Sequence, residues 1–194
     1  MAGNRINIRD IVWAKLIKDT KSELQYGQIK SIVGAMTIGM TPSISAGDLY
    51  GDGVKRESEQ ALTGYDITFE VNKLPLATRA EWLGNEIDSA DGTLTEKADD
   101  SPIEFALGFV VDLSGEGVEC VWFYKVSASP ITNNLQQSTD SRNYSTDTLT
   151  LKAKFRIFDN GIKKFGDTSA DSTLFTKAKA DTFFQSVPGD QTTP

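Results

Sequence analysis

The feature that most constrains the fold of this chain is the alternation of apolar and polar residues in three segments. Residues 36–44, 65–71 and 149–157 each place apolar side chains at every second position. This period of two sends successive side chains to opposite faces of a β-strand. We therefore predict three strands with one face directed toward a core. The inward residues are Met36, Ile38, Met40 and Ile44 in the first strand, Tyr65, Ile67, Phe69 and Val71 in the second, and Leu149, Leu151, Ala153, Phe155 and Ile157 in the third.

Two further segments are almost continuously apolar and predict the central strands. Residues 101–113 and 118–129 are separated only by "SGEG", which favours a hairpin whose strands are covered on both faces. Cys120 falls inside the second run, where a small buried side chain is expected. Because neighbours on a strand point to opposite faces, Trp122, Phe123 and Tyr124 cannot form one aromatic platform and are expected in the core. Lys152, Lys154 and Arg156 are expected as an outward basic row on the last strand.

Helical signals are fewer. Residues 75–84 begin with Pro75, repeat apolar residues at Leu76, Ala80 and Leu83, and end with Gly84, which predicts a short helix with a glycine C-cap. Residues 170–187 predict a second helix, with a strand or a docking tail as alternatives. The chain is thus expected to form one domain over 1–194 of a mainly β (α+β) class, a sandwich or barrel-like fold with one flanking helix. Its parts are an N-terminal segment (1–25), a long extended inter-strand arm (42–63) and a C-terminal segment (168–194).

Composition excludes several classes of function. The chain has no histidine, which removes Ser-His-Asp and Cys-His nucleophiles and histidine metal sites. We therefore expect no enzyme, no metal and no cofactor. A net charge of −7 argues against DNA binding through phosphate neutralisation. No apolar run reaches the ~18 residues of a membrane-spanning helix, so no membrane association is expected. Charges scattered through the first residues do not resemble a signal peptide, which predicts synthesis in the cytoplasm.

The segment 45–64, "SAGDLYGDGVKRESEQALTG", combines ligand-like residues with a strand-like pattern. Its acidic residues do not have the spacing of an EF-hand loop, and no Gly-Lys-Ser/Thr follows that would bind a phosphate. Its second half alternates like a strand but offers little apolar surface for a core of its own. Such a segment is stable when it pairs with a sheet edge or lies along a neighbouring protein. Asp99 and Asp100, before Ser101 and Pro102, are interpreted as a solvated turn, not a catalytic carboxylate pair.

Several motifs occur in a fixed order between Tyr26 and Asp167. They are "GQIKSIVGAMTIGMTPSISAGDLYGDG", "GYDITFEVNKLP", "ATRAEWLG", an acidic loop, "FALGFVVDLSGEGVECVWFYKVSAS" and "STDTLTLKAKFRIFDNGIKKFGDT". Together they resemble the major tail protein, or tail tube protein, family of long-tailed non-contractile phages (siphophages). These motifs are patterns of strands and turns, without a chemical signature among them.

The resemblance implies a structural virion protein with no catalytic residue and no cofactor. It implies a tail tube fold whose subunits form hexameric rings, stacked around the tape measure protein into a conduit for DNA ejection. The implied partners are copies of itself, the tape measure protein, and the tail terminator and distal tail proteins. DNA is expected to pass through an acidic lumen without specific binding. The alternative is a β-sandwich binding module that recognises carbohydrate or a host surface.

The matching stretch for subunit contacts is the arm, 42–63. We expect its glycines to permit bending, its apolar residues to anchor on a neighbour and its charges to set the register. The expected self-assembly residues are Gly47, Leu49, Tyr50, Gly51, Gly53, Val54, Lys55, Arg56, Glu57 and Glu59.

Overall fold

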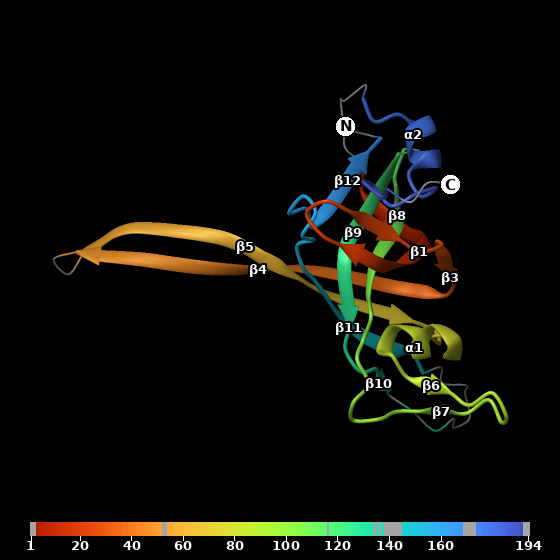
Figure 1. Cartoon of the computed structure of the whole chain (residues 1–194). Helices are drawn as coiled ribbons and strands as arrows, with labels where there is room; N and C mark the ends of the chain where they lie inside the picture. Colours follow the sequence, from red (N-terminus) through yellow and green to blue (C-terminus); the bar gives the residue numbers. More distant parts are fainter. Residues whose placement is uncertain are drawn as a thin grey trace.

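The molecule consists of a β-rich body from which one long two-stranded arm projects (Figure 1). This computed structural model describes residues 3–51, 54–115, 117–133, 135, 137, 145–168 and 174–191, and excludes the side chains of 48–51 and 54–58. The expected mainly β class, with a flanking helix and an extended arm, is confirmed.

Within the described residues, ten strands form one antiparallel sheet in the order β2-β1-β8-β9-β11-β5-β4. Three short strands pair beside this path: β3 with β1, β10 with β11, and β12 with β9. The ten strands are β1 (Arg5–Asp19), β2 (Leu24–Tyr26), β3 (Lys30–Ile32), β4 (Ala35–Gly51), β5 (Val54–Val71), β8 (Glu104–Leu113), β9 (Val118–Ala128), β10 (Thr132–Asn133), β11 (Asp147–Ala153) and β12 (Lys163–Asp167). A separate two-stranded sheet holds β6 (Glu86–Ile87) and β7 (Leu94–Thr95).

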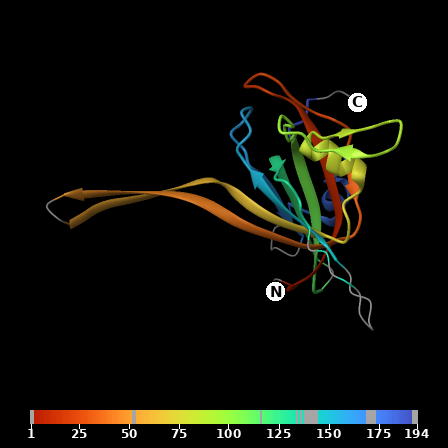
Figure 2. The same ribbon diagram turned by 90° about the horizontal axis from the view of Figure 1, so that it is seen from below.

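Strand β9 is the point at which the sheet divides. Its first half pairs with β12, from Glu119↔Asp167 to Phe123↔Lys163, and its second half pairs with β11. Its other edge is paired with β8 throughout, which confirms the central hairpin expected from the two apolar runs. The sheet curls around an interior instead of lying flat, as two views at right angles show (Figures 1 and 2).

The interior core is built around stacked aromatic rings. The ring of Trp82, from α1 (Leu76–Leu83), stacks on Phe105 at 4.3 Å between centroids, and Trp13 meets Trp82 edge-on at 5.7 Å. The second predicted strand supplies fully buried side chains to this core, as its alternation indicated. Gly84 ends α1 in the left-handed conformation, with φ 73°, which confirms the predicted C-cap. Leu76, expected on the packed face of this helix, is exposed instead.

The opposite face of the central hairpin is covered by the C-terminal segment. Trp122 Nε1 donates a hydrogen bond to the carbonyl oxygen of Phe183 at 3.0 Å, and the ring of Phe184 packs against Trp122. The helix in this region, α2 (Lys177–Thr182), is shorter than expected and ends before Phe183 and Phe184. Residues 174–191 thus pack on their own subunit.

The expected basic row is wrong at its last member. Strand β11 ends at Ala153, and the chain then turns, so Arg156 does not continue the outward alternation. Its side chain is buried, whereas Ile157, expected inward, is exposed. Lys152 and Lys154 are exposed as predicted.

Candidate assembly surface

The arm is a continuation of β4 and β5 beyond the body. Strand β11 pairs with β5 from Val71 as far as Tyr65, opposite Ala153. From there to the Gly51↔Val54 pair, β4 and β5 pair only with each other within the described chain. Residues 43–51 of β4 extend about 30 Å at ~3.3 Å per residue. Both outer edges of the arm therefore present backbone groups that no described strand covers.

Two features fix the point where the arm leaves the body. Gly64 lies so close to β11 that a Cβ there would stand 2.7 Å from the carbonyl oxygen of Ala153, so a side chain would displace the backbone. Next to it a β-bulge shifts the register between Ser43↔Gly64 and Ile44↔Leu62. The hydroxyl of Thr63, the additional residue, donates a hydrogen bond to the carbonyl of Ser43 at 2.9 Å. The bulge shifts the alternation of β5 by one position, so Leu62 faces the same side as the buried core residues of β5.

An exposed apolar row runs along this face of β4. Met36, Met40 and Ile44 were expected in the core, but all three are exposed. They share a face with fully buried residues of β5, because Met40 pairs with Ile67 across the strands. The alternation was therefore predicted correctly and the burial was not. The reason is that β4 is the edge strand of the sheet, so its inner face is covered only in part: Ala35 and Ile38 pack against the core, whereas the other three residues face water.

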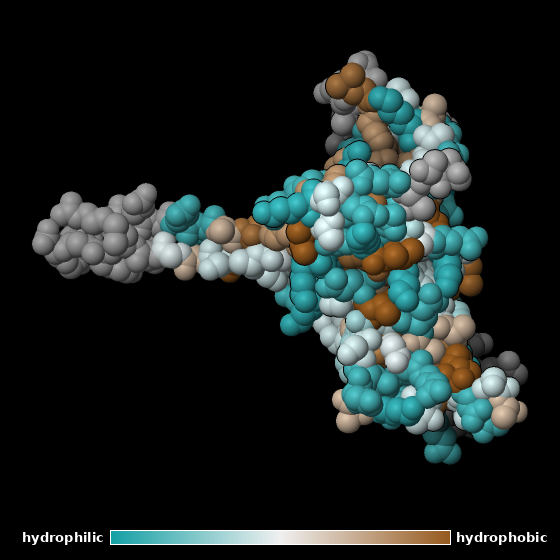
Figure 3. Space-filling view, in the orientation of Figure 1, coloured by the Kyte–Doolittle hydropathy of each residue, from teal (hydrophilic) through white to brown (hydrophobic). Residues whose placement is uncertain are grey.

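On the arm itself this row ends in a cross-strand pair. Ile44 and Leu62 stand directly opposite each other, with 56% and 38% of their surface exposed. Directly opposed residues of antiparallel strands touch, so the two side chains form one apolar knob. Figure 3 shows apolar surface where the arm joins the body.

Beside the arm, the body opens in an apolar groove of about 410 Å³. Core residues Phe109, Val111 and Val121 form its floor. Its walls come from three strands: Ile6 and Ile8 of β1, Met36, Ile38 and Met40 of β4, and Phe165 of β12. Ile6, Met36, Met40 and Phe165 are exposed. The groove is thus an open end of the interior core.

Charged residues stand at the mouth of this groove. Arg5 Nε donates to Glu119 Oε2 at 2.7 Å, and Glu119 is buried while the Arg5 side chain is 65% exposed. The Glu119 carboxylate raises the pKa of Arg5 through this hydrogen bond and its charge. Lys163 Nζ lies 4.7 Å from the centre of the Tyr65 ring. Two cations and one paired anion therefore line the groove.

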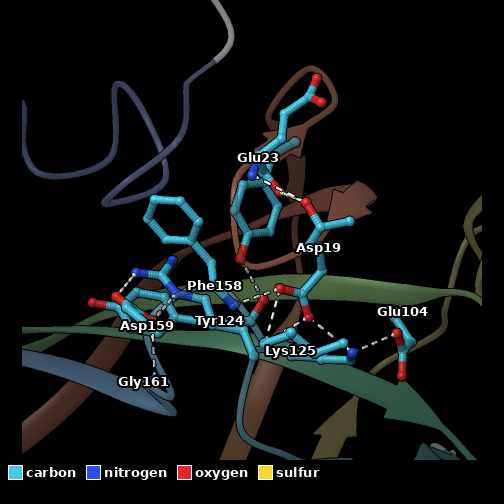
Figure 4. Close-up of polar contacts among 12 residues, drawn as sticks. Asp19, Glu23, Glu104, Tyr124, Lys125, Phe158, Asp159 and Gly161 are labelled. Carbon is cyan, nitrogen blue, oxygen red and sulfur yellow. Dashed lines mark hydrogen bonds and ion pairs between the residues drawn. The ribbon is translucent and has the colours of Figure 1, made fainter.

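A buried polar network holds the opposite end of the body together (Figure 4). The Asp19 carboxylate accepts hydrogen bonds from the backbone N–H groups of Ile157 and Phe158 at 2.8 and 3.1 Å, and from Lys125 Nζ at 2.9 Å. Burial alone would raise the pKa of Asp19, but these donors outweigh it and hold the pKa below its usual value. Lys125 also pairs with Glu104 at 3.2 Å. The network ties β1 and β9 to the turn after β11.

Arg156 extends this network to the C-terminal segment. Its guanidinium binds both oxygens of Asp159, at 2.7 and 2.6 Å, and donates to the carbonyl of Pro188 at 2.7 Å. The guanidinium also lies over the Tyr124 ring, 3.7 Å from its centre. The Tyr26 hydroxyl donates to the Tyr124 carbonyl at 2.9 Å, and burial raises the pKa of Tyr26 to about 12. These groups bind one another and serve structure.

Cys120, the single cysteine of the chain, is buried. Burial raises the pKa of the Cys120 thiol to about 11, which keeps it protonated near neutral pH and therefore a poor nucleophile. No group of three or more histidine, cysteine, aspartate or glutamate side chains is placed to hold a metal ion in the described chain. None of the described helices has the length and apolarity required to cross a membrane. Asp100 lies in a turn, as expected, accepting hydrogen bonds from Lys97 N and Asn85 Nδ2.

The comparisons with known proteins include a structural likeness to a phage-related assembly. The chain is similar to a chain of the six-fold symmetrised cryo-EM structure of the anti-feeding prophage (AFP) baseplate, at 9% sequence identity and a TM-score of 0.42. The match covers 88% of this chain and 100% of that one. Neither a family model nor a curated protein matches the sequence. This level of likeness assigns neither a family nor an activity.

The residues expected to mediate self-assembly lie along the arm. The backbones of Gly47, Leu49, Tyr50 and Gly51 belong to β4, and those of Val54, Lys55, Arg56, Glu57 and Glu59 belong to β5. Gly53 and the side chains of 49–51 and 54–57 lie outside the described part of the structure. Glu59 is exposed, opposite Gly47 in the ladder. A Cβ at Gly47 would meet nothing within 4 Å among the described atoms.

Sequence reasoning missed the apolar knob and the groove. The alternation predicts Ile44 in the core, and Leu62 lies in the half of 45–64 that alternates like a strand. A signal was present: the strand containing Ile44 continues directly into a segment too polar for a core. The groove combines residues from five strands, which are far apart in the sequence, so no local pattern indicates it.

Proposed function

We propose that this chain is a structural protein of a phage tail-type particle, and within it a subunit of the tail tube. In this proposal copies of the chain form hexameric rings that stack around a tape measure protein. The finished tube then conducts DNA during ejection and joins tail terminator and distal tail proteins at its ends. The resemblance of 26–167 to tail tube proteins supplies these finer features.

The observation that carries the proposal is the arm. It extends about 30 Å from the body, pairs with no described strand other than its own, and exposes the apolar Ile44–Leu62 pair. In an isolated subunit this arrangement leaves two uncovered strand edges and an apolar surface in water, both of which favour pairing with another chain. Repeated head-to-tail contact between copies would cover them, and such contacts generate rings or helical filaments.

Charge and chemistry support a passive conduit. A net charge of −7 repels the phosphates of DNA, so a wall built from such subunits would let DNA slide without binding it. The proposal includes no catalytic role and no cofactor. It places the protein in the virion after synthesis in the cytoplasm of the host.

The test is assembly of the intact chain and of a variant with a shortened arm. Replacing residues 47–59 by Asn-Gly joins the Ala46↔Gln60 pair through a two-residue hairpin turn, which keeps the register of the remaining strands. Negative-stain electron microscopy and sedimentation over a concentration series are expected to show rings or tubes for the intact chain and a folded monomer for the variant. A monomeric intact chain at every concentration would refute the proposal, as would unchanged assembly of the variant.

The competing function is a binding module for carbohydrate or a host surface. The groove supports this alternative function because the groove is concave and carries an exposed aromatic ring, that of Phe165. A module of this kind would be a discrete monomer or small oligomer and would bind through that groove. Glycan binding by the intact chain, abolished by Phe165→Ala without any change in oligomeric state, would favour this alternative.

A further inference from the structure

The body and the arm each expose an apolar surface, and the two are complementary in form. The Ile44–Leu62 knob protrudes on both strands of a narrow hairpin. The groove, at about 410 Å³, is concave and floored by core side chains. Burying the knob in the groove would remove apolar surface from water on both sides, which is the main favourable contribution to protein association.

The knob cannot reach the groove of its own chain. Met36 and Met40, in the groove wall, lie on the same strand and the same face as Ile44. Four strand residues, about 13 Å, separate Met40 from Ile44, and the paired hairpin runs straight away from the body (Figure 1). Folding back would require breaking the β4–β5 ladder at this point. An arm that fills the groove must therefore come from another molecule.

Charge favours the arm of a second copy as this occupant. The arm, 42–63, contains four acidic residues, Asp48, Asp52, Glu57 and Glu59, against two basic ones. The groove lining carries the exposed Lys163 and an ion pair between Arg5 and Glu119, its single acidic residue, so its net charge is +1 (two cations and one anion). An acidic arm that enters a groove with a basic mouth is an electrostatically complementary contact.

We propose that the groove is the receptor for the arm of a neighbouring copy of this chain, with Ile44 and Leu62 inserted between β1, β4 and β12. This inference rests on the proposed function, and it adds the surface that receives the arm. The contact is heterologous, because the knob and the groove are different parts of the chain. Each subunit thus gives its arm to one neighbour and receives an arm from another, which propagates assembly.

Two positions on β1 allow a matched test. Ile6 lines the groove and is 67% exposed, whereas Ile17, on the same strand, is 61% exposed and lies outside the groove. Introducing Asp at either position costs little in the monomer, since both side chains already face water. We expect Ile6→Asp to raise the concentration at which the full chain assembles by about tenfold or more, because the carboxylate must be desolvated in the contact. Ile17→Asp should leave that concentration unchanged.

Crosslinking of mixed copies identifies the partner surface directly. A preparation carrying Ile44→Cys is mixed with one carrying Ile6→Cys or, as control, Ile17→Cys. The native Cys120 is buried in all of them. Disulfide-linked heterodimers are expected to form about tenfold more with Ile6→Cys than with Ile17→Cys, because only the first pair is held together in the contact.

The outcomes separate this inference from the function on which it rests. Assembly by the intact chain with equal crosslinking at both positions, or with equal effects of the two Asp substitutions, would refute the arm-in-groove contact and leave the proposed function standing. No assembly of the intact chain at any concentration would refute both.

Discussion

Two fully buried tryptophans, Trp82 and Trp122, differ in whether the indole N–H has a hydrogen-bond acceptor. Trp122 Nε1 donates to the carbonyl of Phe183 at 3.0 Å, whereas Trp82 Nε1 has no acceptor among the described residues. Replacing either residue with Phe removes the indole N–H and reduces the ring by a similar volume. We predict that Trp122→Phe lowers the free energy of unfolding more than Trp82→Phe does.

The difference follows from what each N–H contributes. Trp122→Phe removes a hydrogen bond with a net contribution of about 1 kcal/mol and leaves the partly exposed Phe183 carbonyl without its donor. Trp82→Phe removes a buried donor whose desolvation costs at least about 1 kcal/mol in the native protein, so this gain offsets part of the packing loss. The packing losses are of similar origin and largely cancel in the comparison. We therefore expect the two variants to differ by about 2 kcal/mol.

Urea unfolding followed by far-ultraviolet circular dichroism measures both free energies without relying on tryptophan emission. Amide hydrogen exchange provides a second signature: Trp122→Phe is expected to speed exchange in 183–191, and Trp82→Phe is not. Equal destabilisation, or a larger loss for Trp82→Phe, would refute the reasoning, since it would mean that the Trp82 N–H is stabilised in the native state.

Three further predictions address backbone contact, pH and the C-terminal segment. Gly64→Ala should destabilise the fold by roughly 1–3 kcal/mol, because the added Cβ would stand 2.7 Å from a β11 carbonyl oxygen. Gly47→Ala, whose Cβ meets no described atom within 4 Å, should be neutral or slightly stabilising. Coinciding thermal unfolding curves of the two variants would contradict this prediction. The pKa of Asp19 is lower in the folded state, so its stabilisation is present above the unfolded value of about 3.8 and is lost as the pH falls through the folded pKa. Between about pH 5 and 2 the free energy of unfolding should therefore fall less steeply for Asp19→Asn than for the native chain, and parallel curves would disprove the contribution. Arg156→Lys should lower the free energy of unfolding by about 1–3 kcal/mol and speed amide hydrogen exchange in 183–191. The reason is that lysine cannot bind both oxygens of Asp159 and the Pro188 carbonyl at the same time. Unchanged exchange would show that Arg156 does not hold this segment in place.

Local patterns predicted the strands well where the pattern and the packing coincide. Ile67, Phe69 and Val71 alternate into the core as expected, and Gly84 ends the helix where its conformational freedom suggested. Both features depend on residues close together in the sequence.

Burial at the edge of the sheet was not predictable in the same way. Alternation shows that Met36 and Met40 share a face with core residues, but it does not show whether another layer covers that face. Arg156 was misplaced for a related reason, since the end of β11 is set by a turn that Asp159 stabilises through its contacts with Arg156 and the Gly161 N–H. The groove depends on strands brought together from both ends of the chain, and only the assembled sheet places them side by side.

The shared use of β5 by the core and the arm has a mechanical consequence. Seven residue pairs, from Val71↔Asp147 to Tyr65↔Ala153, join β5 to β11 inside the body, and the same strand continues outward as half of the arm. Their hydrogen bonds run perpendicular to the strands. A pull along the arm therefore strains all of them at once in shear and does not open them one after another, as a pull across the sheet would. The arm is therefore anchored in the body by hydrogen bonds that share the load, which suits a subunit that must withstand tension from its neighbours.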